Sequence, residues 1–532
     1  MLMSCRSSGI IFLQIIKMDF MKRDGALTSL WQAGMPEYEA RAVDLTGQTF
    51  NVVIVGGGVT GVTTALQLQK SGKRCLLIEA QNLCFGTTGG TTAHLNTFFD
   101  TGYNKVASAF GEDDAQLLSR AAMSALELYQ KNVEEYQIDC GYAQKDGYLY
   151  AQDDKQAEEL DKIYEASKTA GVDVAYTDTI PVPIDFQKAI VYHEQAQVHA
   201  TKYVYALAKA FEDEGGVLLQ HCRVEGFKDK TNELEVNTSM GDVKAGALIW
   251  ATHIPPGINL LHFRCAPYRS YAMAVTLKDG IYPEGLAYDM YDPYHYYRTQ
   301  EVDGVKYLIV GGEDHKTGHE ENTEAPFAKL EAHIRTHFEV EEVKYKWSSQ
   351  FFEPADGLAY IGHLPGNPEQ VLVATGFGGN GMTYSHIAAI IFTELITKGQ
   401  SMYASLFSPD RLKPVAGFSN FVKENADVIK EFIGKRLSKE KLTELADLAP
   451  GEARLVKYEG KSLALYKSEE GVLHAINPVC THAKCTVGWN SAEKSWDCPC
   501  HGARYTIDGE VLTGPAMHQL EVIELKSLVE KE

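Results

Sequence analysis

The stretch Val-Val-Ile-Val-Gly-Gly-Gly-Val-Thr-Gly, residues 52–61, decides the fold of this chain. Four consecutive apolar residues are typical of a buried strand, and the glycines after them allow a tight turn into a helix that ends at Ser71-Gly72. A second strand follows at residues 73–78 and is closed by Glu79. A strand, glycine turn, helix, strand and acid in this order predict a dinucleotide site. In such a site the helix N-terminus faces the pyrophosphate and the acid accepts hydrogen bonds from ribose hydroxyls.

Two cysteine–histidine pairs lie near the other end of the chain. The first pair is Cys480 and His482, in Cys480-Thr-His482. The second pair is Cys498 and His501, in Cys498-Pro-Cys-His501. Two thiolates and two imidazoles suit a two-iron, two-sulfur cluster in which one iron takes both cysteines and the other takes both histidines. A structural zinc site can also use two cysteines and two histidines, but zinc spacings usually pair like residues with like. The pattern therefore favours a one-electron carrier.

The residues around these pairs make the prediction more specific. Residues 480–485 read Cys-Thr-His-Ala-Lys-Cys, residues 498–502 read Cys-Pro-Cys-His-Gly, and residues 514–516 read Gly-Pro-Ala. This segment resembles the Rieske family, in its disulfide-bearing branch, over residues 446–532. The resemblance implies a cluster held by Cys480, His482, Cys498 and His501. One spare cysteine stands in each loop, and the resemblance implies a disulfide between them, Cys485 with Cys500.

Further segments indicate which dinucleotide binds at the glycine turn. Residues 86–94 are small and rich in hydroxyls, residues 246–252 form a candidate strand, and residues 370–375 lead into the glycine-rich run 376–382. Together they resemble the FAD-dependent amino-acid oxidase family, which includes glycine and sarcosine oxidases, over about residues 51–400. The resemblance implies noncovalent FAD, with contacts at Gly56, Gly58, Gly61, Glu79, Thr87, Thr88, Val224, Gly376, Gly378, Gly381 and Met382.

We therefore predict an α/β Rossmann-type FAD-binding domain with a mixed-sheet substrate domain, followed by a small all-β C-terminal Rieske domain. The expected division is an N-terminal extension (1–50), the FAD-binding and substrate part (51–400), a helical linker (401–447) and the Rieske domain (448–532). The substrate part is expected at about residues 141–200 and 260–350. In the linker, Val428, Ile429, Phe432, Ile433 and Leu437 recur at helical spacing, which favours an amphipathic helix over a solvated tether.

Substrate contacts are expected in the region between the FAD-binding segments. In the resembled family an arginine there clamps a substrate carboxylate, a task that suits a planar guanidinium. Arg298 and Arg269 are the candidates, with Tyr296 or His295 as polar neighbours. Ordinary strand packing is the alternative for each of them. His199 precedes a predicted helix, and we expect it to cap or pack rather than to catalyse.

The two cofactors together imply an oxidoreductase. The resemblance implies hydride transfer from carbon beside an amine nitrogen to FAD, and single electrons then leave through the cluster to an external one-electron acceptor. One alternative is a redox relay or sensor that exchanges electrons with a partner protein and has no small substrate. Another is reduction of the cluster by NAD(P)H. Against it, Gly399 stands where a second dinucleotide site would place its acid.

The composition and net charge of the chain argue against several classes of function. The 532 residues carry a net charge of −21, which argues against binding to nucleic acid or to an anionic membrane surface. The apolar stretch at residues 9–16 is short for a membrane span and lacks a following cleavage site, so we expect a cytoplasmic protein. The other six cysteines are expected to be reduced thiols: Cys5, Cys75, Cys84, Cys140, Cys222 and Cys265.

Overall fold

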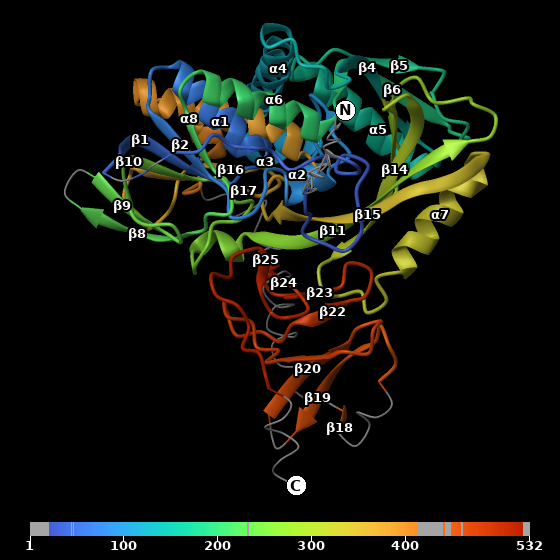
Figure 1. Cartoon of the computed structure of the whole chain (residues 1–532). Coiled ribbons are helices and arrows are strands. Elements are labelled where there is room, and N and C mark those ends of the chain that lie inside the picture. The colour runs from blue at the N-terminus through green and yellow to red at the C-terminus, as the bar shows by residue number, and fades with distance from the viewer. Residues whose placement is uncertain are drawn as a thin grey trace, which may run out of the picture.

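The computed structural model describes residues 21–43, 45, 47–230, 233–411, 440–441, 448–458 and 461–524. It confirms the predicted fold class. Two large sheets and the helices around them form one part of the molecule, and a small all-β lobe lies beneath β11 and β15 (Figure 1).

The glycine turn belongs to an eight-stranded sheet of the order β16-β17-β10-β1-β2-β7, with β9 on β10 and β8 on β9. β1 pairs in parallel with both β2 and β10, as a dinucleotide-binding sheet requires. The strands are β1 (Thr49–Val55), β2 (Cys75–Ile78), β7 (Val217–Leu219), β8 (Val224–Lys230), β9 (Glu233–Thr238), β10 (Val243–Trp250), β16 (Tyr360–His363) and β17 (Val371–Thr375).

Both faces of this sheet are covered at β1. Val52 and Ile54 belong to the core shared with the helices, whereas Val53 and Val55 pack on the other side with Val236 of β9. Successive strand residues point to opposite faces, so a strand covered on both sides needs an unbroken apolar run. This is the physical reason for the sequence pattern at residues 52–55.

A second, nine-stranded sheet forms the substrate part, with the order β15-β11-β14-β13-β12-β4-β6-β3 and with β5 on β6. It is mixed, because β12 pairs in parallel with β4 while its other neighbour, β13, is antiparallel. The strands are β3 (His94–Leu95), β4 (Ala143–Ala151), β5 (Val174–Thr177), β6 (Lys188–Gln197), β11 (Cys265–Leu277), β12 (Leu286–Tyr288), β13 (Tyr296–Val302), β14 (Val305–Lys316) and β15 (Val340–Pro354).

Helices α1, α6 and α8 cover the first sheet, and α7 packs on the second (Figure 1). His199 caps α6 by accepting a hydrogen bond from the Lys202 backbone N–H, in keeping with its expected capping role. The helices are α1 (Val59–Lys70), α2 (Thr87–Gly90), α3 (Tyr103–Phe110), α4 (Glu112–Glu135), α5 (Asp154–Thr169), α6 (Ala200–Asp213), the 3-10 helix η1 (Leu260–Phe263), α7 (Ala325–His337), α8 (Gly381–Lys398) and α9 (Ala404–Phe407).

The C-terminal lobe consists of two four-stranded sheets. The sheet β22-β23-β24-β25 carries the second cysteine–histidine loop between β23 and β24, and the sheet β18-β19-β20-β21 lies farther from the large sheets (Figure 1). The strands are β18 (Glu440–Lys441), β19 (Ala453–Tyr458), β20 (Lys461–Lys467), β21 (Leu473–Ile476), β22 (Gly488–Asn490), β23 (Ser495–Asp497), β24 (Arg504–Tyr505) and β25 (Val511–Thr513).

The segment before β1 is part of the core. Leu30 and Trp31 are buried, and the Trp31 indole N–H donates to the carbonyl of Thr91. Residues 21–43 therefore hold the loop that follows α2. The amphipathic helix predicted within residues 401–447 lies outside the described residues.

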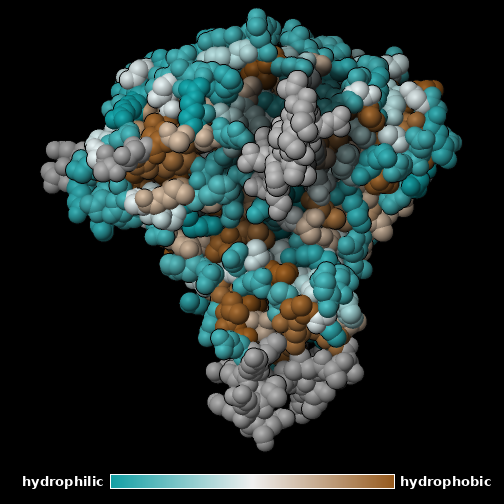
Figure 2. Space-filling model, in the orientation of Figure 1, coloured by the Kyte–Doolittle hydropathy of each residue, from teal (hydrophilic) through white to brown (hydrophobic). Residues whose placement is uncertain are grey.

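The face of the molecule in Figure 2 is mainly hydrophilic over the large sheets, in keeping with the net charge, and apolar residues gather nearer the C-terminal lobe. Among the described residues, none of the helices combines the length and the apolar character needed to cross a bilayer.

Candidate functional site

The glycine turn after β1 can be built only from glycine at two of its positions. Gly56 has a φ of +115°, and a Cβ there would lie 2.4 Å from the Ala251 carbonyl oxygen. A Cβ on Gly61 would lie 1.9 Å from the Gly56 carbonyl oxygen, so helix α1 and the turn approach too closely for any side chain. Gly58 precedes α1 and offers no side-chain cap; the Val59 N–H donates to Thr88 Oγ1 at 3.1 Å, and the other N–H groups of the first turn can face an anionic group.

Glu79 lies beside the turn. Its carboxylate accepts hydrogen bonds from the backbone N–H groups of Gly57 at 2.6 Å and Gln81 at 2.8 Å, and it also lines the cavity described below. Burial raises the pKa of Glu79, and these two N–H donors oppose that rise. The acid thus ties the turn to the end of β2 while its remaining lone pairs face the cavity.

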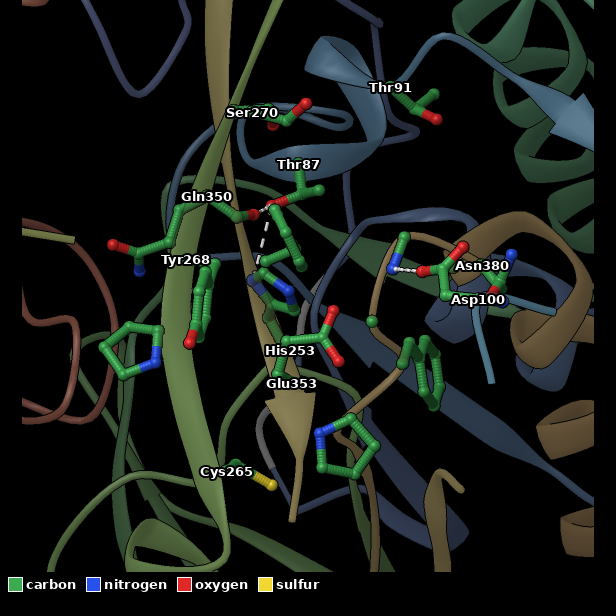
Figure 3. A pocket seen from close by; sticks show the side chains of 18 of the residues that line it. Thr87, Thr91, Asp100, His253, Cys265, Tyr268, Ser270, Gln350, Glu353 and Asn380 are labelled. Carbon is green, nitrogen blue, oxygen red and sulfur yellow. Dashed lines mark hydrogen bonds between the residues drawn. The ribbon is translucent and has the colours of Figure 1, made fainter. Parts of the chain in front are cut away.

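One cavity of about 990 Å³ begins at this turn and extends to the C-terminal lobe. Figure 3 shows part of its wall, where Thr87 donates to the Gln350 carbonyl oxygen at 2.9 Å and Asp100 lies beside Asn380. The wall contains most of the predicted FAD contacts: Gly56, Gly58, Glu79, Thr87, Thr88, Val224, Gly378, Gly381 and Met382. Gly61 and Gly376 are not in this wall, and they shape the turns that form it.

A tyrosine-rich region of the wall lies over the glycine-rich loop before α8. Asp100 accepts from the Gly379 N–H at 2.8 Å and from the Tyr294 hydroxyl at 3.1 Å, which fixes that loop. The Tyr296 and Ser270 hydroxyls are 3.0 Å apart, and Asp314 lines the same region. Burial raises the pKa of Asp314 to about 7. Neither Asp100 nor Asp314 is predicted as a site residue from the sequence, because only their convergence in space distinguishes them from surface carboxylates.

The structure does not bring the four predicted substrate residues together. His295, the alternative to Tyr296, pairs with Asp289 at 2.8 Å and is not in the cavity wall. Tyr296 lines the cavity, but the guanidinium groups of Arg298 and Arg269 lie outside its wall in the described part of the chain. Arg298 is fully buried and donates to the carbonyls of Thr92 and Ala93, both at 2.7 Å. This arginine therefore fixes the loop after α2, and its geometry does not support a carboxylate clamp.

Arg269 points towards the C-terminal lobe. It donates to Ser348 Oγ at 2.8 Å and pairs with Asp497 at 3.2 Å. It belongs to a buried charge network of three arginines and three carboxylates that joins the N-terminal segment, the second sheet and the lobe: Arg23, Arg269, Arg504, Asp24, Glu493 and Asp497.

The four predicted cluster ligands converge within the lobe. Cys480 and Cys498 are free, buried thiols, and the rings of His482 and His501 are 5.0 Å apart. The Nδ1 atoms of both histidines are buried without a hydrogen-bond partner in the structure. His482 Nε2 lies 3.1 Å from the Gly257 carbonyl oxygen, which can only accept, so Nε2 carries the proton and Nδ1 keeps its lone pair.

This donor set fits a Rieske cluster. Two thiols and two imidazole nitrogens are available in a buried site, and such orphaned nitrogens are costly unless a metal takes them. The predicted disulfide is confirmed, since Cys485 and Cys500 are bonded and their Cα atoms are 6.5 Å apart. Gly514 brings the following loop against the cluster loops, because a Cβ there would lie 2.5 Å from the Gly502 carbonyl oxygen.

Comparisons with known proteins agree with both sites. The family described as "FAD dependent oxidoreductase" matches residues 51–395, and "Rieske [2Fe-2S] domain" matches residues 438–524. A Bacillus subtilis (strain 168) protein named for a Rieske 2Fe-2S centre, YhfW, is 34% identical over 89% of this chain and 93% of its own length.

Two further relatives cover the part of the chain that contains the large sheets. The gamma-glutamylputrescine oxidoreductase of Escherichia coli (strain K12) is 23% identical over 65% of this chain and 84% of its own length. The crystal structure of glycine oxidase from Geobacillus kaustophilus matches with a TM-score of 0.57 at 19% identity, over 68% of this chain and 99% of that chain. This last similarity concerns the fold.

Proposed function

Because the chain belongs to the FAD-dependent oxidoreductase family and ends in a Rieske domain, we propose that it oxidises the C–N bond of an amine or amino acid and releases the electrons singly to an external acceptor. The observation that carries this proposal is the shared cavity. Its wall runs from Gly56 and Glu79 at the dinucleotide turn to Cys500 and Gly514 in the cluster loops. Residues of the dinucleotide turn and of the cluster loops thus line one cavity, which supports a proposal that joins substrate oxidation to single-electron transfer.

When bound, FAD supplies a two-electron acceptor for the hydride, and the cluster supplies a one-electron path. An amine that carries hydrogen on the carbon beside its nitrogen gives the corresponding imine, two protons and two electrons. Two molecules of a one-electron acceptor outside the protein take up those electrons, so the reaction balances without consuming oxygen.

The side chains of the cavity hold the reacting groups and keep water away. Asp100 fixes the loop at Gly379, which leads into α8. Tyr288 and Tyr296 of the second sheet, together with Tyr294 of the loop between β12 and β13, supply an aromatic wall. Side chains arranged in this way restrict the substrate to few orientations, which is a large part of what an enzyme contributes when a cofactor carries the chemistry.

Asp100 and Asp314 in this region favour a cationic amine group near the wall, since an ammonium is a suitable partner for a buried carboxylate. The names of two relatives, glycine oxidase and gamma-glutamylputrescine oxidoreductase, also refer to amine compounds. These observations support the amine or amino-acid class and leave the particular compound to experiment.

The test is anaerobic mixing of the holoprotein with glycine, sarcosine, proline, simple primary amines and diamines, while flavin and cluster absorbance are followed together. We expect at least one compound to bleach the flavin first and the cluster afterwards. If no amine or amino acid in the panel reduces the flavin, the proposal is wrong.

A redox relay without a small substrate is the second candidate. It predicts that the flavin exchanges electrons only with a reduced partner protein, whereas a cavity of about 990 Å³ with polar groups at Asp100, Tyr294 and Tyr296 favours a small-molecule substrate. Rapid bleaching by NADPH in the same experiment would instead favour reduction of the cluster by a nicotinamide cofactor.

A further inference from the structure

The side of the cluster site that contains His482 and His501, here called the histidine edge, packs against the flavin-binding part of the chain. His482 and His501 are 9% and 5% exposed. The ring of His262 in η1 lies 4.6 Å from the His482 ring at 87° and 5.8 Å from the His501 ring, and the Phe263 ring lies 5.7 Å from that of His501. The edge through which a Rieske cluster could meet an outside partner is therefore covered by this chain itself.

His262 is held rigidly in that position. Its Nδ1 accepts from the Asn259 backbone N–H at 3.3 Å, and its Nε2 donates to the Pro255 carbonyl oxygen at 2.9 Å. The Asn259 side chain in turn accepts from the Leu261 N–H at 3.0 Å and completes a capping box at η1. Both ring nitrogens are thus satisfied within the segment, which leaves the faces and edges of the ring to contact the cluster ligands.

Gly257 adds a second attachment from the same segment. Its carbonyl accepts from His482 Nε2 at 3.1 Å, and its N–H donates to the Pro515 carbonyl oxygen at 3.1 Å. One residue therefore binds a predicted iron ligand and the loop that covers the cluster. The φ of +75° at Gly257 lies in the left-handed region, which a side chain would strain.

The same segment forms part of the cavity wall. His262 and Phe263 line the cavity from one side, and Cys500, Gly514 and Met517 line it from the other. His262 and Phe263 thus contact both the cavity and the rings of the predicted cluster ligands His482 and His501.

We propose that residues 255–263 form a rigid surface, here called the seat, on which the two predicted histidine ligands His482 and His501 pack. We further propose that His262 is a positioning residue for electron transfer between the flavin site and the cluster. This inference rests on the proposed function. One hydride supplies two electrons, so each turnover needs two single-electron crossings at this seat. The external acceptor empties the cluster after each crossing, and it approaches from a side other than the histidine edge.

The test needs no substrate. The holoprotein is placed under anaerobic conditions with EDTA, and light reduces the flavin directly while cluster reduction is followed by absorbance and by electron paramagnetic resonance. In the native protein the cluster should become reduced promptly after the flavin. In His262→Ala cluster reduction should be slower by about tenfold or more, since small displacements of reacting groups have large kinetic effects, and the cluster resonance should shift while iron content stays unchanged.

Matched variants distinguish a positioning role of His262 from a general loss of structure in η1. Leu260→Ala alters an exposed residue of the same 3-10 helix, 47% exposed, and should behave like the native protein. His262→Phe keeps an aromatic ring in the seat and should recover most of the native rate. Asn259→Ala removes the side chain that accepts from the Leu261 N–H and lies 3.3 Å from His262 Nε2, so η1 should loosen and the variant should resemble His262→Ala.

Native kinetics and an unchanged resonance in both His262→Ala and Asn259→Ala would overturn the inference, as would a native cluster that stays oxidised when light reduces the flavin. Failure of every amine to bleach the flavin would refute the proposed function while leaving this light-driven experiment readable, so the two failures can be told apart.

Discussion

Arg269 and Asp497 form an ion pair of 3.2 Å across the junction between the second sheet and the Rieske domain, and their side chains are only 1% and 4% exposed. Asp497 also pairs with Arg504 at 3.1 Å. Charges buried this completely are stable only while their partners remain in place. The junction is therefore specific, and the Rieske domain is anchored to the flavin-binding part in one orientation.

Asp497→Asn should destabilise this junction. The change leaves Arg269 and Arg504 buried with less compensating charge, which costs about 3 kcal/mol or more in buried pairs. Urea unfolding followed by cluster absorbance measures the loss. Asp508→Asn, which breaks an exposed pair with His474 in the same domain, is the control and should cost about 0–1 kcal/mol. Equal effects of the two changes would contradict the anchoring role.

Acid should weaken the same junction through Glu493. Burial alone would raise the pKa of this carboxyl, but Arg23, Arg269 and Arg504 outweigh it and lower the pKa from 4.5 to about 2. In the unfolded chain Glu493 therefore becomes protonated near pH 4.5, whereas in the folded chain it becomes protonated only near pH 2.

The stabilisation from Glu493 should thus be complete above pH 4.5 and be lost progressively as the pH falls towards 2. Thermal unfolding of native protein and Glu493→Gln across this window measures it. Both proteins share the acid lability of the cluster, so the difference between them reports on Glu493. Parallel pH profiles would show that this carboxylate does not stabilise the junction.

Tyr505→Phe should lower the reduction potential of the cluster. The Tyr505 hydroxyl lies 3.2 Å from Cys480 Sγ, and a hydrogen bond to a ligand sulfur favours the more negative, reduced state. Redox titration monitored by electron paramagnetic resonance measures the shift. Tyr466→Phe, at a ring that packs on Trp489 instead, is a suitable control. A potential that stays constant or rises in Tyr505→Phe would count against this bond.

Gly61→Ala should abolish FAD binding and leave the cluster intact. The added methyl group would collide with the Gly56 carbonyl oxygen and displace the turn that faces the cavity. Purified variant protein should lack flavin absorbance yet contain iron and sulfide at native levels. If Gly61→Ala still contained one FAD per chain, FAD would bind at a site other than the glycine turn, and the prediction would be wrong.

Asp314→Asn should remove a pH dependence from substrate binding. With a pKa raised to about 7 by burial, Asp314 is neutral below that pH and negative above it, and Asp100, Glu313 and His295 are its charged neighbours. The KM for an ammonium substrate should therefore fall as pH rises through 7 in native protein and change little in the variant. Stopped-flow flavin reduction at several pH values supplies the comparison.

The sequence by itself determined the glycine turn at residues 56–61 and predicted the ligand set Cys480, His482, Cys498 and His501. Both depend on residues that are close together in the chain. The backbone conformation of the turn requires glycine at particular positions. The irons of a Rieske cluster bind cysteine and histidine side chains, which occur here at short spacing. The disulfide Cys485–Cys500 is implied by the resemblance to the Rieske family, and the structure contains it.

Only the tertiary structure decided the roles of Arg269 and Arg298, and only it revealed the seat at Gly257 and His262. A guanidinium looks the same in sequence whether it faces a substrate or a buried aspartate 228 residues away. Arg269 pairs with Asp497 because the second sheet and the C-terminal lobe pack there, and Arg298 binds the carbonyls of Thr92 and Ala93 because that loop packs on β13; no local pattern encodes either contact.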